Sequence, residues 1–147
     1  MATMSASERF EVPPETLWAV AGRWDHFEEI TGEVVRGCVV EQAGRSRRVF
    51  LDEGIEIEEP LLHFDHANRT IAWGIGPCKN FDPPIVPQSF VGRFSVRPAG
   101  SGSFLDIEWR YELKPGEGAE AEALLRDYFR ICFEGTRQTL RARGALP

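Results

Sequence analysis

The stretch EGAEAEALLRDYFRICFEGTRQTLRAR, residues 117–143, decides the fold of this chain. Its apolar side chains recur every three or four residues, which is the spacing of one face of an α-helix. The positions on this face are Leu124, Leu125, Tyr128, Phe129, Cys132, Phe133, Thr136 and Leu140. A helix of about 25 residues is about 38 Å long, enough to cross a whole small sheet. We therefore predict one long C-terminal helix whose aromatic face lies against a sheet.

Strand-like segments fill most of the chain before this helix. The predicted strands are residues 7–12, 33–40, 47–51, 55–65, 70–75, 89–97 and 103–113. Short turns separate most of them, and such turns join antiparallel neighbours. In the last segment apolar residues alternate with charged ones, which is typical of a strand with one buried and one solvent-exposed face. Residues 76–87 carry four prolines, so we expect a long loop there.

Two short helices are predicted directly after the first strand. Pro13 and Pro14 end that strand, and proline is well tolerated at the start of a helix, here residues 15–23. Asp25 is a candidate N-cap for a second helix that Gly32 would stop. The predicted class is therefore α+β: a curved, seven-stranded antiparallel sheet wrapped around a long C-terminal helix, with two short helices after the first strand.

Size and charge narrow the classes of function. The length of 147 residues suits one domain, residues 1–147, because domains commonly hold about 100–150 residues. The net charge of −6 argues against nucleic acid as a partner, because nucleic acid attracts clustered Lys and Arg. No apolar run approaches the roughly 18 residues of a membrane span, so no membrane insertion is expected.

The cysteines and the first residues favour a reducing compartment. Cys38, Cys78 and Cys132 are odd in number and widely spaced, which argues against a disulfide framework and against a metal site. The opening MATMSASERF lacks a basic region followed by an apolar stretch, so we expect no export signal and a cytoplasmic location. No glycine motif for phosphate is present, and no cofactor is expected. The sequence does not decide the oligomeric state, and a homodimer is one alternative.

Two segments carry a resemblance to known proteins. The opening FEVPPETLWAV, residues 10–20, places proline before a tryptophan-bearing helix. Gly44-x-x-Arg47, then Gly54, then Glu59-x-Leu61-Leu62-x-x-Asp65 repeat a spacing of the same family. Together, over nearly the whole chain, they resemble the START-related (SRPBCC) superfamily. It includes polyketide cyclase/dehydrase-like proteins, pollen-allergen-type lipid carriers, abscisic-acid receptors and lachrymatory-factor synthase.

The resemblance implies a helix-grip fold with an internal cavity for one small apolar molecule. The chain departs from the family at residues 30–32, Ile-Thr-Gly, where many relatives carry a Trp-His-Pro-like turn near one end of the cavity. Periodicity alone favours a solid core for the inward aromatic residues, whereas the resemblance favours a cavity lining. The predicted ligand-binding residues are Trp73, Phe90, Phe94, Trp109, Tyr111, Tyr128, Phe129 and Phe133.

Arg47 and Glu59 form the constellation most like a catalytic site. Glu59 shares the strand parity of Ile57, so a carboxylate falls among inward positions. If residues 53–54 close a tight hairpin, either Arg47 or Arg48 lies opposite Glu59, and a slip of one residue reverses every side chain. Hairpin chemistry does not choose between these registers. The family spacing favours Arg47.

Such a pair has two interpretations. In a cavity, an arginine can stabilise a developing oxyanion and a buried carboxylate can move a proton. The resemblance implies these roles for Arg47 and Glu59, as in lachrymatory-factor synthase. The tyrosine of that enzyme is matched here by Phe90, which argues against the same reaction. The alternative is a structural ion pair, because buried charges normally persist only when paired. Arg47 and Glu59 are the candidate catalytic residues.

The sequence signals for other catalytic residues are weaker. His63 has the buried parity of its strand, but a lone core histidine is usually only hydrogen-bonded. Two main function classes remain open for a protein that binds a small hydrophobic metabolite. One is a polyketide cyclase/dehydratase-like enzyme or an isomerase, and the other is a non-catalytic carrier or sensor of lipids or other hydrophobic ligands.

Overall fold

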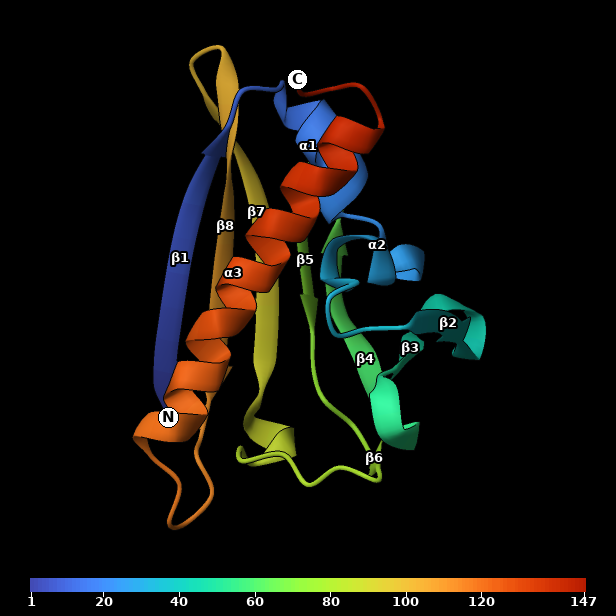
Figure 1. The fold of residues 1–147 in the computed structure, drawn as a ribbon, viewed down its shortest axis with the longest axis vertical. Helices are drawn as coiled ribbons and strands as arrows, with labels where there is room; N and C mark the ends of the chain where they lie inside the picture. Colours follow the sequence, from blue (N-terminus) through green and yellow to red (C-terminus); the bar gives the residue numbers. More distant parts are fainter.

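The computed structural model describes residues 1–147 as an antiparallel sheet curved around one long helix (Figure 1). Seven strands form the continuous path of the sheet, which confirms the predicted helix-grip architecture. A further two-residue strand, β6 (Cys78–Lys79), pairs with one of them inside the predicted loop. From one edge to the other the seven are β1 (Ala2–Phe10), β8 (Gly102–Tyr111), β7 (Val91–Ala99), β5 (Thr70–Trp73), β4 (Glu56–Asp65), β3 (Ser46–Phe50) and β2 (Gly37–Glu41).

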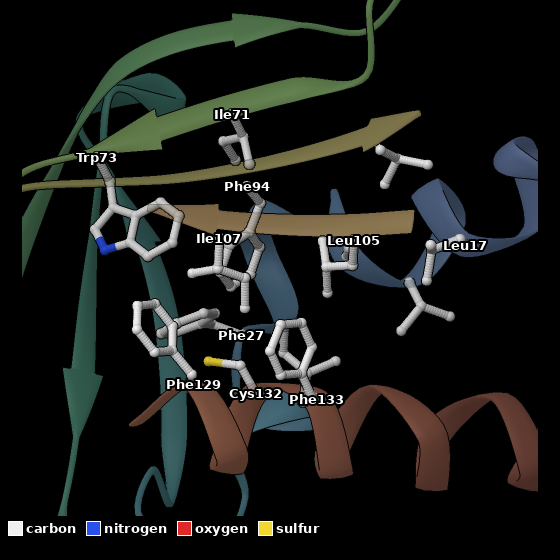
Figure 2. Packing of buried hydrophobic residues seen from close by; sticks show 14 of the residues in the cluster. Leu17, Phe27, Ile71, Trp73, Phe94, Leu105, Ile107, Phe129, Cys132 and Phe133 are labelled. Atoms are coloured by element: carbon white, nitrogen blue, oxygen red, sulfur yellow. The ribbon is translucent and has the colours of Figure 1, made fainter. Parts of the chain in front are cut away.

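The long helix α3 (Ala119–Ala142) lies against this sheet and confirms the predicted amphipathic face. Figure 2 shows Phe129, Cys132 and Phe133 pointing from α3 toward Phe94 and Ile107 of the sheet. Burying a side chain as large as phenylalanine stabilises the fold by about 1.5–3 kcal/mol. No helix has both the length and the apolar composition needed to cross a membrane.

Two short helices follow β1, as predicted. They are α1 (Pro14–Ala21) and α2 (Glu28–Thr31), with a 3₁₀ turn, η1 (Trp24–His26), between them. The expected N-cap role of Asp25 is wrong: Phe27 occupies the N-cap position, and the Asp25 carboxylate lies 3.8 Å from Arg23 Nε instead. Further 3₁₀ turns are η2 (Gln42–Gly44), η3 (Asp52–Gly54) and η4 (Pro87–Ser89).

Gly135 allows α3 to pass directly over α2. A Cβ atom at this position would lie only 1.8 Å from the carbonyl oxygen of Ile30. One turn later, the Thr139 hydroxyl donates a 2.9 Å hydrogen bond to the carbonyl of Glu29. Because only glycine fits this crossing, the helix is locked at one height above the segment that precedes β2.

The bounds of most strands differ from the predicted ones by one or two residues, and two strands begin four or more residues away from the predicted start. β1 begins at Ala2 rather than at residue 7, because Ala2 pairs with Tyr111 at the far end of β8. Such a distant partner leaves no local signal. β2 begins at Gly37 rather than at residue 33, because the amides of Val34 and Val35 bond the carbonyl of Thr31 in a turn.

A β-bulge in β4 reverses the expected orientation of His63. Leu61 pairs with Trp73 and His63 pairs with Ala72, so Leu62 is an extra residue on this strand. A bulge shifts the alternation of side chains by one position. His63 is therefore exposed, which removes it from the interior where the parity of β4 had placed it.

Candidate ligand-binding site

The hairpin of β3 and β4 places Arg47 directly opposite Glu59. Its turn contains Glu53 and Gly54 with φ angles of 63° and 73°, a left-handed conformation that glycine adopts easily. The Leu51 amide bonds the Ile55 carbonyl at 2.9 Å and closes the hairpin. The register that the family spacing favoured, with Arg47 rather than Arg48 facing inward, is confirmed.

The guanidinium of Arg47 is enclosed on all sides, with 1% of the residue exposed. Its Nε donates a 2.7 Å hydrogen bond to Glu59 Oε1, and Nη1 donates one of 3.3 Å to the carbonyl of Trp24. Its central carbon lies 4.0 Å from the ring centre of Trp24, 3.8 Å from that of Phe27 and 5.1 Å from that of Trp73. These contacts combine an ion pair with cation–π attraction. Nη2 alone has no partner.

An apolar cavity of about 220 Å³ lies beside this pair, between the sheet and the first turns of α3. Fifteen of its eighteen lining residues are hydrophobic, and Glu59 is the only charged one. Phe81 and Leu124, 41% and 62% exposed, mark its mouth. Ligand sites of proteins commonly have this character, with a mainly apolar wall and few polar groups that orient the ligand.

Arg47 itself does not line the cavity. The sequence interpretation had the guanidinium facing the ligand beside the carboxylate. In the structure Phe27 and Trp73 line the cavity and also lie against the guanidinium, so their rings separate it from the cavity. The pair therefore offers a ligand only its carboxylate.

The structure brings four of the eight predicted ligand-binding residues to the cavity wall and leaves four away from it. Trp73, Phe90, Trp109 and Tyr128 line the cavity. Phe94, Tyr111, Phe129 and Phe133 do not, contrary to the expectation that all eight would. Four side chains thus come to one site from β5, the end of η4, β8 and α3.

The excluded phenylalanines form solid core instead. Phe94 packs edge-on against Trp73, with ring centres 4.9 Å apart, and Phe129 stacks on Trp109 at 5.1 Å. Figure 2 shows Phe133 farther along α3, among aliphatic side chains. These rings support the cavity wall from behind, because each of the first two contacts a lining tryptophan.

The two tyrosines differ in what their hydroxyls contact. Tyr111 donates a 2.9 Å hydrogen bond to Glu122 of α3, so its hydroxyl is already engaged. The Tyr128 hydroxyl has no hydrogen-bond partner in the protein, although Tyr128 lines the cavity. Tyr128 is therefore the tyrosine that can bond a ligand.

Sequence reasoning missed all of the aliphatic residues that line the cavity. Val49 and Ile57 share the inward parity of Arg47 and Glu59, which is a signal that identifies them. The 76–87 loop had no such signal, because it folds back over the sheet end through a bridge between Ile85 and Leu113. The lining residues not predicted are Phe27, Val35, Val49, Leu51, Ile57, Ile75, Phe81, Pro83, Pro84, Ile85, Ala121, Leu124 and Leu125.

Burial controls the protonation of the groups around the cavity. It raises the pKa of Glu59 above its ordinary value, and the neighbouring charge of Arg47 opposes this shift. Burial also raises the pKa of Tyr128 well above 10 and that of the Cys132 thiol, so both stay protonated at neutral pH. Nowhere do three His, Cys, Asp or Glu side chains gather in a group that could hold a metal ion.

The comparison with known families agrees with this geometry. Residues 1–141 match the family described as "Polyketide cyclase / dehydrase and lipid transport". The chain belongs to this family. Membership confirms the resemblance seen in the sequence. The description of the polyketide cyclase / dehydrase and lipid transport family and the apolar cavity both support a fold that binds hydrophobic ligands.

Solved structures related to this member of the polyketide cyclase / dehydrase and lipid transport family share its fold at low sequence identity. The protein XoxI from Bacillus cereus is 18% identical with a TM-score of 0.83, over 94% of each chain. An uncharacterised protein from Bacillus thuringiensis is 16% identical with a TM-score of 0.81, over 93% of this chain and 97% of its own. Ara h 8.0201 is 15% identical with a TM-score of 0.77, over 96% and 98%. No curated protein matches the sequence.

Replacing Arg47 by methionine is expected to destabilise the protein in a pH-dependent way. The change leaves Glu59 buried without a counter-charge, which costs about 3–5 kcal/mol when the carboxyl is ionised. A carboxyl whose pKa is raised by folding stabilises below its unfolded-state pKa, and this stability is lost as the pH rises through the folded-state pKa. The difference from wild type in the free energy of unfolding should therefore be larger at pH 7.5 than at pH 5. Urea titrations at the two pH values measure it.

Arg48→Met is the matched control, because Arg48 is the next residue of β3 but lies on the partly exposed face with Glu41. An exposed ion pair of this kind contributes about 0–1 kcal/mol. The account of a buried pair would be contradicted if Arg47→Met lost no more unfolding free energy than Arg48→Met. It would also be contradicted if the loss in Arg47→Met were the same at both pH values.

Proposed function

We propose that this protein binds one small hydrophobic molecule in the cavity and that Glu59 orients it. The observation that carries the proposal is the single charged group in an otherwise apolar wall. Glu59 uses Oε1 for Arg47, whereas Oε2 has no protein partner and is not among the fully enclosed polar atoms. A carboxylate oxygen in apolar surroundings is unfavourable unless a hydrogen-bond donor meets it. A ligand that supplies the donor would satisfy this oxygen.

Filling the cavity should abolish binding of a simple apolar probe. Ala121 lines the cavity from α3, and Leu at this position adds three carbon atoms to the space that a ligand needs. Toluene should bind wild type saturably, seen as a change in the fluorescence of Trp73 and Trp109, and should not bind Ala121→Leu. Ala123→Leu should bind like wild type, because Ala123 is exposed on the same helix.

Thermal melting curves of Ala121→Leu and Ala123→Leu serve as the control that both variants are folded. No saturable binding of toluene to wild type would refute the proposal, as would unchanged binding to Ala121→Leu.

Proton-transfer catalysis is the second candidate, and the burial of Glu59 favours it. A carboxylate whose pKa is raised toward neutrality is a better general base. Glu59 would take a proton from a carbon next to a ketone, and the Tyr128 hydroxyl would donate a hydrogen bond to the oxygen that gains charge. Arg47 would then be a positioning residue, since aromatic rings separate it from the cavity.

Exchange of α-protons in D₂O tests this candidate without knowledge of the natural substrate. Cyclohexanone should exchange its α-protons faster with wild type than with Glu59→Gln, because the amide cannot accept the proton. Glu58→Gln, on the opposite face of β4, should behave like wild type. The rate, followed by NMR, should rise with pH as Glu59 ionises, and the rise should centre above the ordinary carboxyl range. Equal exchange by wild type and Glu59→Gln would leave the protein a binder without this activity.

A further inference from the structure

Very few polar atoms of the cavity wall can bond a ligand, and they differ in whether they donate or accept a hydrogen bond. Glu59 Oε2 is an acceptor, the Tyr128 hydroxyl can donate or accept, and Trp73 Nε1 is a donor. None of these three atoms has a hydrogen-bond partner in the protein, and none is among the enclosed unpaired atoms. The indole N–H of Trp109 is different, because it donates to the Leu125 carbonyl at 2.9 Å. The charged member of the set is an acceptor, so the strongest hydrogen bond available to a ligand is one that the ligand donates.

The volume of the cavity limits the size of what it can enclose. An apolar cavity of about 150 Å³ holds one benzene molecule. On that scale, the 220 Å³ found here accommodates about nine non-hydrogen atoms. This is the size of phenol with one or two small substituents, or of indole. A fused three-ring compound would have to extend through the mouth, past Phe81 and Leu124.

The shape of the wall favours a flat ring. Besides Phe81 at the mouth, five lining residues are aromatic: Phe27, Trp73, Phe90, Trp109 and Tyr128. Trp73 and Trp109 meet at 74° with ring centres 6.1 Å apart, so the wall presents both a ring face and a ring edge. Aromatic ligands pack well in such offset and edge-on arrangements.

The position of Arg47 excludes anionic ligands from the same space. Its guanidinium bonds Glu59 and the Trp24 carbonyl, and the rings of Phe27 and Trp73 lie between it and the cavity. No cationic residue lines the cavity. A carboxylate ligand would therefore meet the charge of Glu59 without a counter-charge within reach.

We propose that the ligand is a neutral aromatic compound of phenol to indole size whose O–H or N–H group donates a hydrogen bond to Glu59. This inference rests on the proposed binding function and specifies its ligand class.

Calorimetric titrations with four one-ring or indole-sized probes and one larger phenol test the inference. At pH 8, which favours the ionised form of Glu59, phenol and indole should bind at least tenfold more tightly than toluene. Benzoate and the three-ring compound 9-phenanthrol should bind at least tenfold more weakly than phenol. In Glu59→Gln the preference for phenol over toluene should fall at least threefold. Glu58→Gln is the matched control and should keep the wild-type preference.

The possible outcomes distinguish a wrong ligand class from a wrong binding function. Equal affinities for phenol and toluene would overturn the donor assignment while leaving the binding function intact. Tighter binding of benzoate or of 9-phenanthrol than of phenol would overturn the ligand class. Failure of every probe to bind wild type would refute the binding function itself. If Glu59→Gln does not fold, the wild-type comparison decides the ligand class, and Tyr128→Phe shows whether the preference comes from the tyrosine instead.

Discussion

The buried guanidinium of Arg47 joins three parts of the fold. It ties β3 to β4 through Glu59, and both strands to the segment between α1 and α2 through the Trp24 carbonyl and the rings of Trp24 and Phe27. An ion pair of this kind is not simply stabilising, because removing two charges from water costs several kcal/mol per ion. The pair instead fixes a position: while Arg47 is held by these contacts, the carboxylate of Glu59 has one position at the edge of the cavity.

The space between the sheet and α3 is filled at one end and hollow at the other. Toward the later turns of the helix, Phe129, Cys132 and Phe133 reach the sheet and leave no room (Figure 2). Near its start the helix presents the short side chain of Ala121, and the proline-rich loop covers the gap. Gly135 contributes to this arrangement, because it fixes the height of α3 where it crosses Ile30. The cavity is therefore a consequence of where small residues fall along one helix.

Much of the fold was predictable from the sequence because its signals are local. Helical spacing identified α3, alternation identified β8, and the family spacing chose Arg47 in the β3–β4 register. The lining was only partly predictable: Trp73 and Phe94 both face inward, but whether an inward side chain meets a cavity or another ring depends on the distance between sheet and helix. The bulge at Leu62 reversed His63, because it is set by how β4 pairs with β5 and not by the alternation along β4 itself. The separation of Arg47 from the cavity by Phe27 also had no local signal.

A crystal structure of the protein with bound phenol tests the central claim most directly, because it locates the ligand, the carboxylate and the guanidinium together. The account predicts one phenol ring inside the cavity, its oxygen about 2.5–2.8 Å from Glu59 Oε2 as in a charge-assisted hydrogen bond. Arg47 should remain against Trp24 and Phe27, with no contact to the ligand. A phenol bound outside the cavity, or one whose oxygen is held by Arg47 rather than by Glu59, would contradict the account.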